Sequence, residues 1–179
     1  MQAFARRGFQ LRTASLETRI TYTGFLLLML PGVASFVALS LARMGFSPQA
    51  IATYYRGGES EMSFPKTFWQ LTEVSHFHLF TIPVVALILS HLLYGTAAST
   101  RVRIGLTSII YTGALLDVLG PWSVRYLSGA CAYVLLLGWV LLAVGLLATV
   151  AFTLVAMWLP TRKAAQPAFA VSEDGGDKS

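Results

Sequence analysis

Charged residues are scarce in this sequence. Only 12% of its 179 residues are Asp, Glu, Lys or Arg, whereas 55% are hydrophobic. A soluble domain has about 25% charged residues, so this chain has too little charge to cover a surface that faces water. The composition excludes a soluble globular enzyme, a disordered regulator and a nucleic-acid-binding protein.

Cysteine is rarer still, because Cys131 is the only one. One chain therefore cannot form an internal disulfide or a zinc or iron–sulfur site built from cysteines. The sequence also lacks a phosphate-binding glycine loop, a nucleophile elbow and paired carboxylates in its apolar segments, which excludes an ATP-driven pump and a hydrolase. Any metal or cofactor must be held by other side chains.

Four apolar stretches reach the length of about 17–25 residues that a bilayer-crossing helix needs. They lie near residues 20–41, 69–94, 102–119 and 126–159. The last would be roughly 50 Å long as a helix and is expected to tilt or to project beyond the lipid. The sequence predicts an all-α membrane protein, a four-span transmembrane helix bundle.

The basic residues predict the orientation of this bundle, because short loops rich in Lys and Arg stay in the cytoplasm. Basic residues lie before the first span, between the second and third, and after the fourth: Arg6, Arg7, Arg12, Arg19, Arg101, Arg103, Arg162 and Lys163. Both termini are therefore predicted to be cytoplasmic, in a bacterial inner membrane, with an outer loop at about 42–66. Residues 1–163 form the predicted membrane domain, and the polar residues 164–179 form a tail predicted to be disordered.

All three histidines of the chain, His76, His78 and His91, lie on the second span. An ionisable side chain inside a membrane is costly without a partner, which makes a functional role the first hypothesis. A single histidine is more often hydrogen-bonded to a neighbouring helix or placed among the headgroups. Three on one span favour a role as ligands.

Helix geometry separates the three histidines. His76 and His91 would lie about 22 Å apart along the axis and share a broad face, whereas His78 would point about 200° away from His76. Pro83 lies between them and tends to kink a helix. The choice between His76 and His78 at the outer end stays open, with His76 as the nominal choice.

The spacing of 13 to 15 residues between these histidines resembles that on the haem-bearing helices of membrane b-type cytochromes. The resemblance implies haem b near each membrane face, with His76 or His78 as the outer ligand and His91 as the inner one. In that family a second helix supplies the opposing histidine, and this sequence has no second histidine-bearing span. A second copy of the chain, another membrane subunit, a methionine such as Met157, or water would complete the iron.

Two other ligands fit the same residues less well. A chlorophyll-type pigment accepts a single axial histidine and needs no second one. Copper or zinc could bind Glu73, His76 and His78 at the outer end of the span. One regular helix cannot point all three of these side chains at one ion, so this metal site ranks below haem.

The outer loop carries a predicted surface helix and two candidate binding residues. Ser47 is a suitable N-cap before Pro48, and the helix is expected to run to Tyr55 and to end before the glycines that follow. Arg56 and Lys66 are candidates for pairing with haem propionates, for docking an outer electron carrier or for lining a quinone pocket. Taken singly, each also fits an ordinary interfacial charge.

Asp117 is an acidic residue within the third apolar stretch. It is expected to pair with Arg125 across a turn at Gly120 and Pro121, which neutralises both charges. Glycines on the third and fourth spans are expected to allow close helix packing: Gly105, Gly113, Gly138 and Gly145.

These features together predict a haem-bearing integral membrane electron-transfer subunit. It would link the quinol or quinone pool to a periplasmic cytochrome or another partner on the outer side, as a redox subunit within a complex or a homodimer surrounded by lipid. The alternative is a structural or assembly subunit without a cofactor, whose histidines only form hydrogen bonds.

Overall fold

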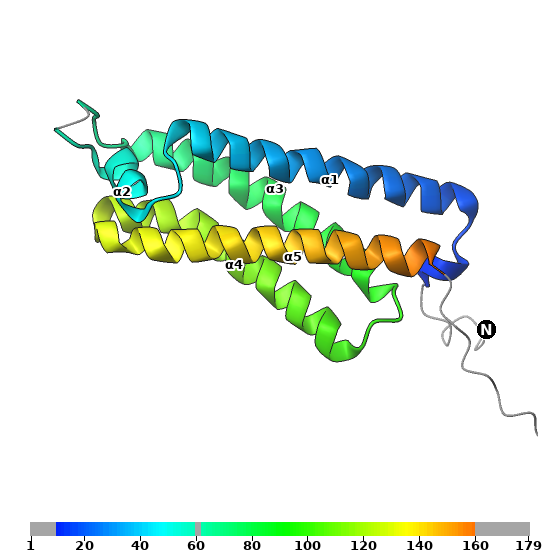
Figure 1. The fold of residues 1–179 in the computed structure, drawn as a ribbon. Coiled ribbons are helices and arrows are strands. Elements are labelled where there is room, and N and C mark those ends of the chain that lie inside the picture. The colour runs from blue at the N-terminus through cyan, green and yellow to red at the C-terminus, as the bar shows by residue number, and fades with distance from the viewer. Residues whose placement is uncertain (1–9, 60–61, 160–179) are drawn as a thin grey trace, which may run out of the picture.

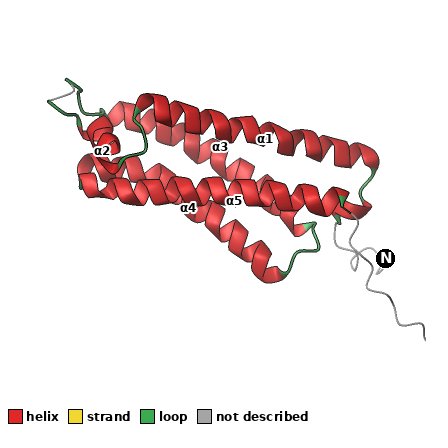
Figure 2. Cartoon of the chain, in the orientation of Figure 1, coloured by secondary structure: helices red, strands yellow, loops and turns green. Residues whose placement is uncertain are grey.

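The protein is a bundle of long helices capped at one end by a short one (Figures 1 and 2). The computed structural model describes residues 10–59 and 62–159. Its elements are, in chain order, η1 (Leu11–Thr13), α1 (Leu16–Arg43), α2 (Pro48–Arg56), α3 (Phe68–Tyr94), α4 (Thr100–Tyr126), η2 (Gly129–Cys131) and α5 (Ala132–Trp158). Within the described ranges there is no strand, only an isolated bridge between Gly58 and Ser63.

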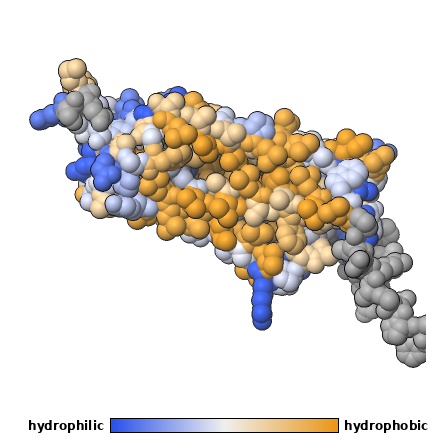
Figure 3. Space-filling view, in the orientation of Figure 1, coloured by the Kyte–Doolittle hydropathy of each residue, from blue (hydrophilic) through white to orange (hydrophobic). Residues whose placement is uncertain are grey.

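Four of these helices are long and apolar enough to cross a membrane: α1, α3, α4 and α5 with the short turn before it. Apolar residues cover the middle of the visible face, and hydrophilic residues gather at the end that holds α2 (Figure 3). We call this the α2 end. The opposite end, where α1 begins and α5 ends (Figure 1), is the terminal end. The predicted four-span all-α fold is confirmed, and the predicted tail at 164–179 lies outside the described residues.

The fourth span begins later than the sequence suggested. The predicted turn at Gly120 and Pro121 is wrong, because α4 continues through both residues to Tyr126. Gly120 packs so closely on α5 that a Cβ there would lie 2.6 Å from Leu135 Cδ1. The chain turns instead after Tyr126, where the carbonyl of Ser123 accepts hydrogen bonds from the backbone of Leu127 and Ser128. α5 (27 residues) is therefore shorter than the predicted span at 126–159, and the predicted start of that span is wrong.

Glycines bring α4 and α5 into close contact. A Cβ at Gly113 would lie 2.6 Å from the backbone nitrogen of Leu142, and Gly138 and Gly145 face α4 at similar distances. Small residues let helix backbones approach in this way inside membranes. The prediction is confirmed for these three glycines but wrong for Gly105, which has nothing within 4 Å.

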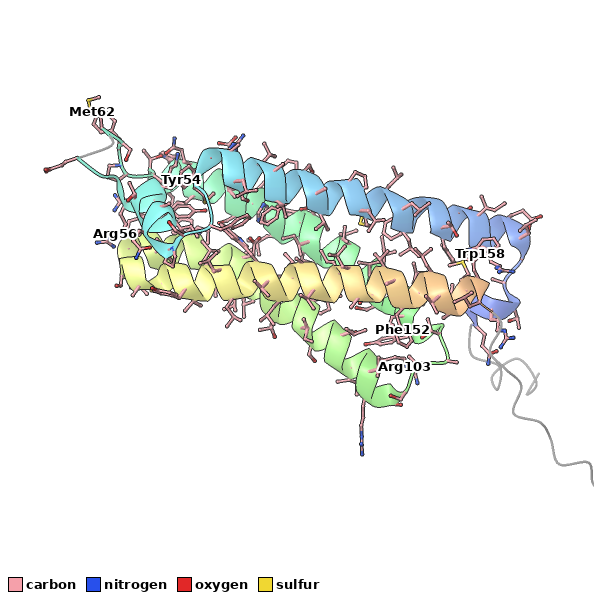
Figure 4. All side chains as sticks on the ribbon, viewed as in Figure 1. Tyr54, Arg56, Met62, Arg103, Phe152 and Trp158 are labelled. Atoms are coloured by element: carbon pink, nitrogen blue, oxygen red, sulfur yellow. The ribbon has the colours of Figure 1, made fainter. Side chains whose placement is uncertain are left out.

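α1 is held at the terminal end by one cluster of contacts. Arg19 donates a hydrogen bond of 2.6 Å from Nη2 to the carbonyl of Met157, and its guanidinium lies 4.1 Å from the ring centroid of Trp158. Trp158 in turn donates to the hydroxyl of Thr23 at 2.9 Å. Figure 4 labels Trp158 at this end. The rest of α1 is largely exposed along its length, as expected for a helix that faces lipid.

The short helix α2 forms as the sequence predicted and runs one residue further, to Arg56. The hydroxyl of Ser47 accepts a hydrogen bond from the backbone of Ala50 at 3.1 Å, and Pro48 occupies the first turn. Gly57 ends the helix with a φ of +80°, a conformation that favours glycine. Ile51 and Tyr55 are buried and anchor α2 to the bundle.

Candidate functional site

The candidate site is centred on the side chain of Asp117, which is only 4% exposed. Its Oδ2 lies 2.6 Å from Nδ1 of His78 on α3, and its Oδ1 accepts a hydrogen bond of 2.8 Å from the indole of Trp139 on α5. Asp117 itself belongs to α4, so three of the spans meet at one carboxylate. Both oxygens have a partner, as a charged group inside a membrane requires.

The predicted pair of Asp117 with Arg125 is wrong. Because α4 stays helical through Pro121, residue 125 lies about 12 Å further along the axis. Arg125 donates from Nε to the carbonyl of Lys66 at 2.9 Å instead. His78, not an arginine, is the basic partner of the buried carboxylate.

The bond to Asp117 decides which nitrogen of His78 is available. An ionised carboxylate can only accept, so a neutral His78 that bonds to one carries its hydrogen on Nδ1 and keeps the lone pair on Nε2. The side chain of His78 is 29% exposed and borders a cavity of about 380 Å³. A histidine that is fixed by a carboxylate and faces a cavity is suited to bind a metal or accept a proton.

The cavity lies between the ends of the helices on the side of α2. Aromatic and apolar walls come from α1, α2 and α5, and polar groups come mainly from α3: Phe36, Leu39, Tyr54, Tyr55, Trp139, Gln70, Glu73, Ser75 and His78. Burial raises the pKa of the Tyr55 phenol well above its ordinary value, so this group remains neutral. Mostly apolar walls with a few polar groups are typical of sites for small molecules and cofactors.

Two cations border this cavity near α2. Arg43, at the end of α1, and Lys66 line both the first cavity and a second one of about 410 Å³. The ammonium of Lys66 also lies 4.1 Å from the ring centroid of Tyr54, which Figure 4 labels beside α2. The arrangement favours a ligand with an apolar body and negatively charged groups.

The structure separates the histidines as helix geometry predicted. His76 and His91 are both exposed, whereas His78 points into the bundle. The ring of His76 lies 5.0 Å from that of Phe80, between centroids. His78 is therefore the histidine that lines the cavity, although His76 was the nominal choice for the outer ligand.

The other predicted site residues are divided in the same way. Lys66 lines the cavity, but Arg56 donates to the carbonyls of Val124 and Arg125 at 3.2 and 3.3 Å. Arg56 thus caps the end of α4, where a cation also interacts favourably with the helix dipole. The structure does not place it beside His78.

The residues predicted as ligands for copper or zinc, and Met157 as a second haem ligand, do not form such sites among the described residues. Among the described residues, no three or more His, Cys, Asp and Glu side chains lie close enough together to hold a metal ion. Glu73, His76 and His78 therefore do not form the predicted copper or zinc site. Met157 is buried in an apolar cluster with Leu89. Its sulfur lies 3.8 Å from the hydroxyl of Thr23, so it serves as packing at the terminal end.

Sequence reasoning missed three residues of the site: the role of Asp117 as partner of His78, and the contributions of Trp139 and Arg43. One signal was present, because Asp117 is the only acidic residue between Glu73 and Glu173. An isolated acid in an apolar segment needs a basic partner on another span. His78 was the candidate for this partner, because it is the one histidine that does not share a face with His76 and His91.

The fold and the site define a multi-pass helical membrane protein with a buried His–Asp–Trp cluster beside a cavity. The chain belongs to the Aq_1264_TM family, a transmembrane helical domain, whose model matches residues 45–164. This match covers α2 to α5 and leaves α1 outside. It is not a match to a b-type cytochrome family. No curated protein and no solved structure matches the chain.

Proposed function

We propose that this chain is a haem-bearing integral membrane subunit that passes electrons between the quinol or quinone pool and a carrier on the outer side of a bacterial inner membrane. The observation that carries the proposal is the bond between Asp117 and His78. Histidines that bind metals usually donate their second ring N–H to a carboxylate or carbonyl, which fixes the ring. His78 has this arrangement and borders the cavity.

The surroundings of His78 support haem as the ligand. The macrocycle is apolar and fits walls such as Phe36 and Trp139, while the propionates are anionic and fit Arg43 and Lys66. Lys66 keeps the role that its sequence position suggested. Arg43 takes the role that was expected of Arg56.

The positive-inside rule assigns the α2 end to the outer side of the membrane. His78 lies ten residues into α3, or about 15 Å from its α2 end, which is suitable for transfer to an outer carrier. His91 would hold a second haem near the inner side. Since His76 and His91 share the exposed face of α3, a second copy or another subunit would supply the ligand opposite His91.

The test is the reduced-minus-oxidised spectrum of the purified protein and of three variants, with haem measured per chain. We expect His78→Ala to lose the outer haem and His91→Ala the inner one, because each removes the nitrogen that this chain supplies. His76→Ala is the matched control on the same helix and should keep both. Absence of a haem band in the parent protein, or equal haem in all variants, would contradict the proposal, and a pigment band would replace haem by a chlorophyll-type ligand.

A structural or assembly subunit without a cofactor is the second candidate. It is favoured by the fact that Asp117 has both oxygens satisfied by the protein itself, so that the cluster joins α3, α4 and α5 without any ligand. Cofactor stoichiometry separates the two functions. A protein that copurifies in a tight complex with no haem, pigment or metal would be the assembly subunit.

A further inference from the structure

One wall of the cavity belongs to a helix that is attached mainly elsewhere. Phe36, Ser40 and Arg43 of α1 line the cavity beside His78. Among the described spans, α1 packs most closely on α5, and Arg19 and Thr23 form their hydrogen bonds with α5 at the terminal end. The half of α1 that closes the cavity is thus the half with the weaker attachment.

The two halves of α1 meet at Pro31 and Gly32. Pro31 has no N–H to donate to the carbonyl of Leu27, so one hydrogen bond of the helix is missing there. Gly32 has no neighbouring atom within 4 Å of a Cβ position, and glycine further weakens a helix. Kinks in helices occur at such positions.

The far end of this segment also ends at a glycine. Gly45 has a φ of +72° and joins α1 to α2, which is itself anchored by buried side chains. Between these two glycines, Phe36 and Met44 pack against the apolar cluster at the α2 end, and the ring of Phe36 meets Trp139 edge-on with centroids 5.7 Å apart. An aromatic pair of this kind contributes about 0.5–1.5 kcal/mol beyond the area that it buries, and no hydrogen bond to another span adds to it among those that the structure gives for this segment.

We infer that residues 33–44 form a gate, which swings about Pro31 and Gly32 and admits a membrane-dissolved amphiphile to the cavity from the side. The side facing lipid is lined by exposed apolar residues of the gate, such as Val37 and Leu41. The Arg19 cluster keeps the other half of α1 in place while the gate moves. The inference concerns how a ligand enters and holds for any occupant, so it does not depend on haem.

The experiment measures how fast a thiol inside the cavity is modified in lipid vesicles. Ser40, which is 5% exposed and lines the cavity, is changed to cysteine in a Cys131→Ser background. One reagent is a lipid-soluble maleimide, and the other is a charged, water-soluble methanethiosulfonate added on both sides. Each rate is divided by the rate of the same reagent on Met62→Cys, because Met62 is 90% exposed in the loop after α2.

We expect the lipid-soluble reagent to react several-fold faster than the water-soluble one after this normalisation. Phe36→Ala should accelerate it further, because the contact with Trp139 is lost. The double change Pro31→Ala, Gly32→Ala should slow it several-fold by restoring a regular helix. Pro83→Ala is the control, since it also replaces a proline inside a span, in the middle of α3, and should leave the rate unchanged.

Two results would overturn the inference. Faster reaction with the water-soluble reagent would show that the cavity opens to water. An equal effect of the double change and of Pro83→Ala would show that α1 does not bend at Pro31. If Ser40→Cys does not fold, Ser75→Cys replaces it, because Ser75 lines the opposite wall of the same cavity.

Discussion

Removing the carboxylate of Asp117 separates its structural role from its chemical one. In Asp117→Ala, the indole N–H of Trp139 and Nδ1 of His78 both lose their partner. Each buried polar group left without a hydrogen bond costs roughly 1–3 kcal/mol. Trp139 is 6% exposed and bears most of the cost, whereas the side chain of His78 is 29% exposed and can bond to water instead. We expect the free energy of unfolding to fall by about 2–4 kcal/mol.

Asp117→Asn should leave stability nearly unchanged and still abolish the function of His78. The amide oxygen can accept from Trp139, but the amide nitrogen then faces Nδ1 of His78 and donates to it. The hydrogen of the imidazole must move to Nε2, which loses its lone pair. We expect a stability loss within about 1 kcal/mol, together with the same loss of bound ligand as in His78→Ala.

Reversible unfolding in mixed detergent micelles measures the stability of both variants. Nitrogen NMR of the His78 imidazole reports its tautomer, and the bound cofactor is measured on the same samples. An Asp117→Ala protein as stable as the parent would refute the energetic reasoning. An Asp117→Asn protein with the parental tautomer and a full complement of ligand would refute the chemical reasoning.

Three further predictions concern helix packing and membrane orientation. Gly113→Ala should destabilise the bundle by about 2 kcal/mol or more in the same unfolding assay, because its Cβ would collide with backbone of α5, whereas Gly24→Ala, with nothing within 4 Å, should not. Arg19→Met should lower the free energy of unfolding by about 1–3 kcal/mol, because the hydrogen bond to Met157 and the contact with Trp158 are both lost. Limited proteolysis should then cut the variant faster than the parent protein near the start of α1. With a reagent that does not cross membranes, Met62→Cys should be labelled in intact right-side-out vesicles and not in inverted ones, because the positive-inside rule places the α2 end outside. Labelling in inverted vesicles only would reverse the predicted orientation.

The spans and α2 could be predicted because their signals are local. Length and apolarity identify a membrane helix, and Ser47 followed by Pro48 identifies the start of α2. The end of α4 could not be predicted in this way. Gly120 and Pro121 have the composition of a turn, but contact of Gly120 with Leu135 on α5 keeps the helix intact. Tertiary packing thus overrode the local preference at this position.

The site could be predicted in part. The 100° rotation per residue correctly placed His78 away from His76 and His91. The partner of the His78 side chain depends on how α3 packs against α4, because Asp117 lies 39 residues further along the chain. Contacts over such separations are not contained in the pattern of any single helix.

The bond between His78 and Asp117 also bears on how the chain is made. An aspartate in the middle of a membrane helix costs about 2.5–3.5 kcal/mol on insertion, and α4 is the least apolar of the four spans. α3 precedes α4 along the chain, so His78 is synthesised before Asp117 and is available to pair with it when α4 inserts. The α3–α4 hairpin can then insert as a unit, with Asp117 already hydrogen-bonded to His78. The order of two helices in the gene thereby supplies, during biogenesis, what the apolarity of α4 alone does not.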